Sequence, residues 1–395
     1  MARQYNHRGA ADAICCAPVH RPRILINALS LTQGGGGHSY LVNLLRELGQ
    51  DSRGFEFTVL AASEELAAAT RTDRIDWAKV SLPALGHAAR LPLRVAFEEA
   101  VLPSRARRFD LLYCPADLSP AFAKTPTVVA LRNLHIYDKR FYETVRLHLL
   151  ERLVQAGVRR ARRILFPTRA AADRISQRIR VPADRIAVVP HGVSPEPFES
   201  VPAKAPRGSH TRYLFLPASI ERHKRIEVLI RSLVHVEDQA LEAWIAGTEK
   251  LDPRYAAELR SLTAELGLES RVRFLGPVPY GEILHYYRGS LALAFPSHLE
   301  TFGQPMLEAM LAETPILAAD IPTFREIAGD IALYFQPDDS VQLARAADAL
   351  IREPEAAKDR VAQGRARAAE FTWKRSVDRL CQVFDEVLSE PRGRA

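Results

Sequence analysis

The sequence contains few cysteines and no long apolar run. Its four cysteines show no metal-binding spacing, because two of them are adjacent and no further ligands follow. We therefore expect reduced thiols. No apolar stretch approaches the roughly 18 residues that a membrane-spanning helix needs, and residues 1–22 lack an apolar segment of signal-peptide length. These absences predict a cytoplasmic protein with a loose tail at residues 1–22 and no transmembrane helix.

Signatures of nucleic-acid and dinucleotide binding are missing as well. The net charge of +7 fits nucleic acid, a membrane surface or anionic substrates as partners. However, the sequence has no zinc finger, aromatic RNA-binding motif or basic helix-turn-helix. The glycine run at residues 34–37 lacks the dinucleotide-binding spacing, and the next predicted strand, residues 55–61, does not end in an acidic residue. We therefore expect neither nucleic acid nor NAD as a ligand.

The chain does contain a regular alternation of strand-like and helical segments over 395 residues, which is enough for two domains. We predict a first domain at residues 23–193, a proline-rich linker at 194–212 and a second domain at 213–373. The alternation is typical of open parallel sheets, so the predicted class is α/β with two Rossmann-like domains. A last helix at 374–390 is expected to pack back on the first domain. Such sheets bind ligands at the carboxyl ends of their strands, which predicts a site between the domains.

One segment, residues 297–320, is a candidate ligand-binding element. A strand is predicted at residues 291–295, a loop follows, and Pro305 occupies a position suited to the first turn of a helix. Two glutamates bracket this turn, Glu300 in the loop and Glu308 one helical turn past Pro305. As a pair of carboxylates they are candidates for an acid and a base.

A second candidate element lies near the N-terminus. The strand predicted at residues 23–27 leads through the glycine run to a helix predicted at about 38–48. Backbone N–H groups of Gly35, Gly36 and Gly37, together with the positive end of the helix, are then available to an anionic or polar ligand. A flexible connection that needs left-handed backbone explains the same glycines, and this alternative stays open.

Two helical segments, residues 90–108 and 139–163, mix basic with apolar residues. Helices of this kind lie on anionic bilayer surfaces. Most helices that cover a sheet share the same pattern, with a solvated polar face. A peripheral contact with the inner face of the membrane and an ordinary helix surface are therefore both open.

Several motifs, in this order along the chain, resemble those of the retaining glycosyltransferases of family four (glycosyl transferases group 1), which have the GT-B fold. An E-x7-E pattern runs from Glu300 to Glu308 as Glu-Thr-Phe-Gly-Gln-Pro-Met-Leu-Glu. Further motifs similar to those of the family are Val-Pro-His-Gly-Val at residues 189–193, His-Lys at 223–224, Phe-Leu-Gly-Pro-Val at 274–278 and Phe-Thr-Trp at 371–373. The resemblance covers nearly the whole chain beyond the tail and implies two Rossmann-like domains facing each other across a cleft.

The resemblance implies a retaining, metal-independent enzyme without a cofactor, which moves a sugar from a UDP or GDP donor to a hydroxyl of a glycan or lipid-linked saccharide. Lys224, assisted by Arg222, would stabilise the leaving diphosphate, because a cation offsets the departing negative charge. Glu300 would contact the donor sugar and Glu308 the ribose hydroxyls. The other donor-binding residues would be Val278 at the nucleobase, Thr301, Phe302 and Gly303 through their backbone, and Gly35, Gly36 and Gly37.

On the first-domain side, His135 lies where the resemblance implies a histidine that lines the active site, which makes it a candidate catalytic residue. A loop histidine without that role is the alternative, and Asn133 is the competing candidate. Two departures from the family pattern concern the donor. Ser219 stands where the family commonly has an arginine, so one cation is lost unless Arg222 or Arg225 replaces it, and Thr301 replaces a glycine. Two other functions therefore stay open: a nucleotide-sugar epimerase or phosphorylase of the same fold, and a nucleotide-sugar-binding subunit that has lost catalysis.

Overall fold

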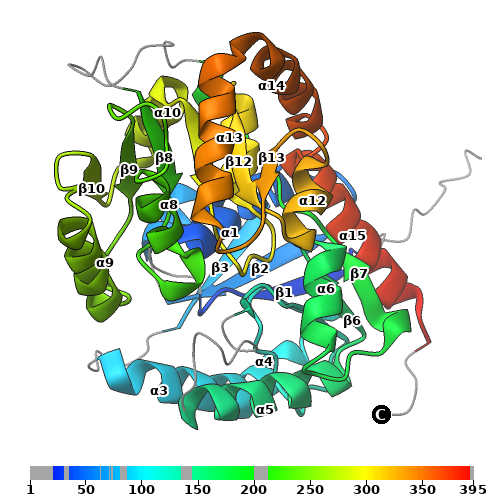
Figure 1. Ribbon diagram of the computed structural model, residues 1–395. Coiled ribbons are helices and arrows are strands. Elements are labelled where there is room, and N and C mark those ends of the chain that lie inside the picture. The colour runs from blue at the N-terminus through cyan, green and yellow to red at the C-terminus, as the bar shows by residue number, and fades with distance from the viewer. Residues whose placement is uncertain are drawn as a thin grey trace, which may run out of the picture.

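Two parallel sheets, one in each half of the chain, form two α/β domains (Figure 1). The computed structural model describes residues 21–30, 35–62, 64–70, 72, 74–80, 87–134, 145–199 and 212–391. The predicted α/β class with two Rossmann-like domains is confirmed.

In the described residues, the first sheet has seven strands in the order β3-β2-β1-β4-β5-β6-β7, all paired in parallel. Inner strands such as β4 are buried along their whole length, as expected for a parallel sheet covered on both faces. The strands are β1 (Arg23–Asn27), β2 (Glu56–Ala61), β3 (Ile75–Lys79), β4 (Leu111–Cys114), β5 (Thr127–Ala130), β6 (Arg163–Phe166) and β7 (Ile186–Val188). The helices are α1 (Gly35–Leu48), α2 (Glu64–Ala69), α3 (His87–Ala100), α4 (Leu102–Ala106), α5 (Val145–Arg160), α6 (Arg169–Ser176), the 3-10 helix η2 (Ala183–Arg185) and α7 (Glu196–Glu199).

The second sheet, within the described part of the chain, has six strands in the order β10-β9-β8-β11-β12-β13, again all parallel. Its strands are β8 (Tyr213–Pro217), β9 (Glu242–Ala246), β10 (Val272–Gly276), β11 (Ala292–Phe295), β12 (Ile316–Ala319) and β13 (Leu333–Phe335). Its helices are the 3-10 helix η3 (Arg222–Lys224), α8 (Ile226–Ser232), α9 (Pro253–Glu265), α10 (Tyr280–Gly289), α11 (Gln304–Leu311), α12 (Pro322–Ala328), α13 (Ser340–Arg352) and α14 (Pro354–Ala368).

The last helix, α15 (Trp373–Ser389), lies on the first domain (Figure 1). Its apolar face, including Leu380 and Phe384, is buried in the same core as α1 and β1. The chain crosses between the domains where residues 192–193 meet residues 371–373. A Cβ on Gly192 would lie 2.3 Å from the backbone nitrogen of Trp373, so glycine permits this close approach.

Three features differ from the sequence-based expectation. Helix α1 begins at Gly35 rather than near residue 38, so the three glycines form its first turn. Strand β3 was not predicted. In the predicted linker, residues 196–199 form the short helix α7, and residues 200–211 lie outside the described residues. Among the described helices, we find none long and apolar enough to cross a bilayer.

Candidate active site between the two domains

The candidate site follows from the strand order. In each sheet the order reverses beside the first strand, since β1 lies between β2 and β4, and β8 lies between β9 and β11. Loops that leave neighbouring strands at such a point turn to opposite sides, and the crevice between them is the usual ligand site of open α/β sheets. The segment before Lys224 leaves β8, and the loop with Glu300 leaves β11. The fold therefore brings together two motifs that are far apart in the sequence.

Lys224 and Glu300 form an ion pair across this crevice. The Lys224 ammonium donates to Glu300 Oε1 at 2.5 Å, and the two side chains are 16% and 15% exposed. The backbone N–H of His298 donates to the His223 carbonyl at 2.9 Å, which fixes the two loops against each other. Both charged groups are still accessible to an entering ligand, so a negatively charged ligand can replace Glu300 as the partner of Lys224.

Glu308 lies on α11, where it is held by two tyrosines. The Tyr287 hydroxyl donates to Glu308 Oε2 at 2.8 Å, and Tyr280 also hydrogen-bonds to this carboxylate. Burial raises the pKa of Glu308 to about 7, although both tyrosine hydrogen bonds act in the opposite direction. Because a carboxylate accepts about four hydrogen bonds, the pair of tyrosines leaves room for two ligand hydroxyls.

The start of α11 depends on Gly303. This residue has a φ of 99°, in the left-handed region, and a Cβ there would lie 3.3 Å from the Phe324 ring. Pro305 occupies the first turn, where its missing N–H costs nothing. The segment predicted as strand, loop and helix thus has that structure, with the helix starting one residue earlier, at Gln304.

The loop between Glu300 and α11 is also attached to the first domain. Thr301 donates from its hydroxyl to the Arg132 carbonyl at 3.1 Å, and its own carbonyl accepts from the Thr168 hydroxyl at 2.8 Å. The Phe302 ring is buried and packs on His191, with ring centroids 4.6 Å apart. The Thr301 side chain, which the sequence showed as a departure from the family pattern, therefore bridges the domains.

A carboxylate of the second domain caps a helix of the first. Glu326 on α12 accepts from the backbone N–H groups of Arg169 and Ala170 at 2.7 and 2.8 Å. These N–H groups lie in the first turn of α6 and have no partner within the helix, and a negative charge is favourable there. This contact and the Thr301 bridge hold the two domains together beside the crevice.

On the first-domain side, the loop after β5 lies over Asp117. Asp117 has a φ of 50° and accepts from the backbone N–H groups of Arg132 and Asn133 at 3.0 and 3.2 Å. Burial raises the pKa of Asp117 to about 6, while these two hydrogen bonds act in the opposite direction. The Asn133 residue itself is exposed. The predicted His135 lies outside the described residues.

The two arginines after β8, Arg222 and Arg225, form ion pairs with carboxylates other than Glu300. Arg222 pairs with Glu258 at 2.8 Å and with Asp252 at 3.4 Å, both on the side of α9. The Ser219 hydroxyl donates to Glu221 Oε2 at 2.6 Å. Arg222 was predicted to assist Lys224 at a diphosphate, but in this structure its charge is directed to α9. Lys224 is thus the cation of this loop that contacts Glu300.

The predicted nucleobase-side residue, Val278, follows β10 and packs on the core of the second domain. It lies two residues before α10, which carries Tyr280 and Tyr287. The two tyrosines were missed by sequence reasoning. Their spacing of seven residues, which places them on one face of a helix, was the available signal, but a helical spacing of aromatic residues is usual for core packing.

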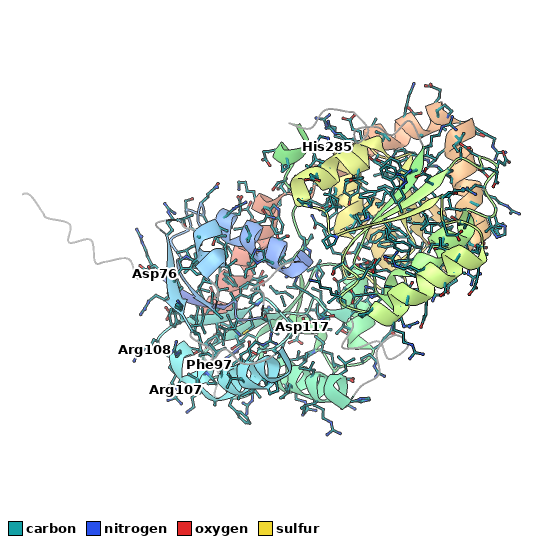
Figure 2. All side chains as sticks on the ribbon, turned by 90° about the vertical axis from the view of Figure 1, so that its left-hand side faces the viewer. Asp76, Phe97, Arg107, Arg108, Asp117 and His285 are labelled. Carbon is teal, nitrogen blue, oxygen red and sulfur yellow. The ribbon has the colours of Figure 1, made fainter. Side chains whose placement is uncertain are left out.

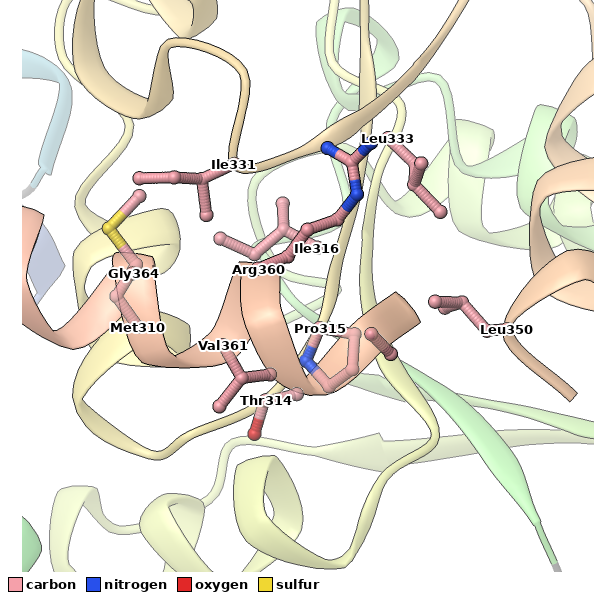
Figure 3. Close-up of a pocket in the computed structure, with 11 residues that line it drawn as sticks. Met310, Thr314, Pro315, Ile316, Ile331, Leu333, Leu350, Arg360, Val361 and Gly364 are labelled. Atoms are coloured by element: carbon pink, nitrogen blue, oxygen red, sulfur yellow. The ribbon is translucent and has the colours of Figure 1, made fainter. Parts of the chain in front are cut away.

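Helix α11 is supported from behind by α14. A narrow hollow, with room for about one water molecule (about 10 Å³), lies between them and is lined mainly by apolar side chains such as Met310 and Val361 (Figure 3). A Cβ on Gly364 would lie 3.2 Å from Met310 Cγ, so glycine lets α14 approach closely. The hollow lies behind the helix that carries Glu308 and does not include the paired residues of the crevice.

Two family models match the chain in sequence. The model described as "Glycosyltransferase Family 4" matches residues 34–197, and the one described as "Glycosyl transferases group 1" matches residues 198–367. Together they cover the two domains seen in the structure.

Curated relatives match part of the chain. It is 28% identical over 216 residues to the O-antigen chain mannosyltransferase RfbU of Salmonella typhimurium. These residues make up 55% of this chain and 57% of RfbU. It is also 28% identical over 256 residues to the D-inositol 3-phosphate glycosyltransferase 1 of Catenulispora acidiphila, 60% of each chain. The chain thus spans less than two thirds of the length of these relatives.

Solved structures share the fold over almost the full length. HepE of Anabaena in complex with UDP-glucose superimposes with a TM-score of 0.74 at 18% identity, covering 93% of this chain and 100% of HepE. The sucrose-phosphate synthase of Thermosynechococcus elongatus gives a TM-score of 0.74 at 16% identity, again covering 93% of this chain and 100% of the other. At these identities the likeness shows a common fold.

Proposed function

The chain belongs to glycosyltransferase family 4, and from this premise we propose that it transfers a sugar from a UDP or GDP donor to a hydroxyl of a glycan or lipid-linked saccharide. The observation that carries the proposal is the arrangement of Lys224, Glu300 and Glu308 at the carboxyl ends of β8 and β11. The proposal agrees with what is similar to this chain: RfbU is named a mannosyltransferase, and HepE, which shares the fold, was solved in complex with UDP-glucose.

In the proposed reaction the bond between the sugar C1 and the β-phosphate oxygen breaks, and a bond from C1 to the acceptor oxygen forms on the same face. The acceptor proton passes to the departing phosphate oxygen, so no separate base is required. Lys224 would leave Glu300 for the diphosphate and offset its growing charge. Glu308 would accept from the ribose hydroxyls, and Glu300 would contact the sugar. The proposal includes no metal ion and predicts full activity in EDTA.

A thermal-shift panel tests the donor class. A ligand that binds only the folded protein raises its stability by about 2.7 kcal/mol at 100 times Kd, so UDP or GDP at that excess should raise the melting temperature by several degrees, and uridine or guanosine by much less. Absence of any shift with nucleoside diphosphates would contradict the proposal. Two further assays distinguish the alternatives. An epimerised sugar after incubation with the donor alone indicates an epimerase. Tight nucleotide binding without turnover on any acceptor indicates a binding subunit.

We also propose that the first domain contacts an anionic membrane surface through α5. Leu149 on this helix is 59% exposed, and Arg152, Arg159 and Arg178 line an open hollow of about 800 Å³, solvent included, beside it. Figure 1 shows α5 at the edge of the first domain together with α3 and α4. Basic side chains near exposed apolar ones are typical of surfaces that lie on anionic lipid.

Vesicle sedimentation tests this contact. Each basic residue near an anionic bilayer contributes about 1 kcal/mol, so the double change Arg152→Gln and Arg159→Gln should weaken binding to anionic vesicles about thirtyfold. Binding should also fall with added salt, because exposed charges are screened. The matched control is Arg212→Gln, an exposed arginine at the start of β8. Wild-type binding that is absent, or insensitive to salt, would rule the contact out.

A further inference from the structure

Arg132 is a partly buried arginine at the junction of the two domains. It lies two residues after β5, its carbonyl accepts from the Thr301 hydroxyl at 3.1 Å, and its backbone N–H donates to Asp117. Its guanidinium carbon lies 3.4 Å from the centre of the Tyr40 ring, and its Nε donates to His191 Nε2 at 3.2 Å. Figure 2 shows the neighbouring Asp117 close to where the two domains meet.

The guanidinium of Arg132 has no ionic partner in the part of the chain that the structure describes. No carboxylate of a described residue lies within ion-pair distance of the guanidinium, and neither of its terminal nitrogens donates a hydrogen bond to a described residue. The Asp117 carboxylate acts on Arg132 electrostatically, but its two hydrogen bonds are accepted from backbone N–H groups of the loop. Burial lowers the pKa of Arg132.

A negatively charged ligand would stabilise this arrangement. A partly buried cation loses some of its solvation, and its neighbours recover only part of that loss. The Tyr40 ring offers a cation–π contact, and His191 accepts one hydrogen bond but carries no negative charge, since burial and Arg132 keep its pKa well below the usual value. The other N–H groups of the guanidinium remain available for two parallel bonds to an anion.

Structural elements of the candidate active site surround the Arg132 guanidinium. Tyr40 is part of α1, whose first turn contains Gly36 and Gly37, and His191 packs on Phe302 in the loop before α11. The first turn of α1 contains no acidic residue, so its positive end adds to the positive potential. Both sides of the candidate active site therefore contribute to the surroundings of Arg132.

We propose that Arg132 is an anion-binding residue of the interdomain site and takes a phosphate group of a substrate. The inference rests on the proposed function for its location in the active site, but the absence of a carboxylate partner is independent of it. The phosphate has two sources, the diphosphate of the donor or an anionic group on the acceptor. Both present the oxygens that a planar guanidinium binds in pairs.

Anion titrations of Arg132→Gln and Arg132→Lys distinguish the two sources. If the donor is bound, each variant should weaken UDP or GDP about tenfold to a hundredfold and leave uridine or guanosine unchanged. If the acceptor anion is bound, UDP affinity should stay the same, while stabilisation of the UDP-saturated protein by inorganic phosphate should be lost. Lysine keeps the positive charge but lacks the planar guanidinium, so Arg132→Lys should lose less anion affinity than Arg132→Gln.

The controls separate this inference from the proposed function. Arg212→Gln, with ionic strength matched by chloride, should behave as wild type. The melting temperature of unliganded Arg132→Gln should stay the same or rise, because a shielded charge is removed. On the wild-type protein, phosphate should slow the labelling of Arg132 by phenylglyoxal, read by mass spectrometry.

Wild-type affinities in both variants, or no protection of Arg132 by any anion, would overturn the inference. If such a result accompanies nucleotide binding that depends on Lys224, the proposed function stands and only the role of Arg132 is wrong. If the wild type binds no nucleoside diphosphate but phosphate still protects Arg132, the proposed function fails and the anion site remains.

Discussion

Replacing Lys224 with alanine is expected to lower the rate of sugar transfer by about 10²–10³-fold, the usual loss when one fixed donor to a developing negative charge is removed. The Lys224 ammonium is held at 2.5 Å from Glu300 in a partly shielded crevice, where charge interactions are stronger than in water. The diphosphate gains charge as its bond to the sugar breaks, so the loss should appear mainly in kcat. Initial rates at saturating donor and a separate Kd for the nucleoside diphosphate measure the two effects.

A second set of variants checks whether Lys224 acts on the substrate or only on Glu300. If the lysine merely neutralises Glu300, then Glu300→Gln should restore activity to Lys224→Ala. We expect no such rescue, because the diphosphate would still lack its cation. Arg212→Gln removes an exposed cation at the opposite end of β8 and should retain wild-type rates. Near-native turnover in both Lys224→Ala and Glu308→Ala would refute the assigned mechanism.

The fold was predictable because strands that are buried on both faces of a sheet are recognisable in the sequence. Strands such as β4 and β11 are wholly buried and are therefore continuous apolar runs. Strand β3, with the sequence Ile-Asp-Trp-Ala-Lys, is at the edge of its sheet and mostly not buried. It has no apolar run, which is why it was missed.

The start of α1 was misplaced for a related reason. Glycine is a poor helix former, by about 1 kcal/mol relative to alanine, so three successive glycines predict a loop. In the structure, the helix nevertheless begins at Gly35, and its buried face, with Leu41, Leu44 and Leu48, packs in the core of the first domain. Tertiary packing thus overrides a local preference that sequence reasoning weighs too heavily.

The site residues were predicted as far as local sequence extends. Glu300 and Glu308 belong to one loop and the helix that follows it, so the sequence alone predicts the element on which each lies. The partners of these residues depend on the strand order, which brings Lys224 to Glu300 across 76 positions and Thr301 to Arg132 across 169. No periodicity along the chain encodes such pairs. The roles assigned to these residues stay predictions. Arg132 was identified as a candidate site residue only from its contacts in the folded chain.

The second large effect is expected at Glu308. In Glu308→Ala, the ribose hydroxyls lose two hydrogen bonds to a charged acceptor, each worth about 1.5–3 kcal/mol, so donor affinity should fall by at least about a hundredfold. Glu308→Gln keeps the shape and one acceptor oxygen and should lose less. Isothermal titration of the nucleoside diphosphate measures both losses. Equal affinity in wild type and Glu308→Ala would show that the ribose binds elsewhere.

The pH dependence gives Glu308 a separate signature. Its pKa is raised to about 7 by burial, so the carboxyl is largely protonated below pH 7 and a poorer acceptor for hydroxyls. Donor affinity should therefore rise with pH through about 7, and weaken about tenfold for each unit below it. Glu308→Gln should abolish this dependence. In Tyr287→Phe the midpoint should move to higher pH, since the lost hydroxyl favours the charged form. A midpoint that stays fixed in Tyr287→Phe would mean that the titrating group is not Glu308.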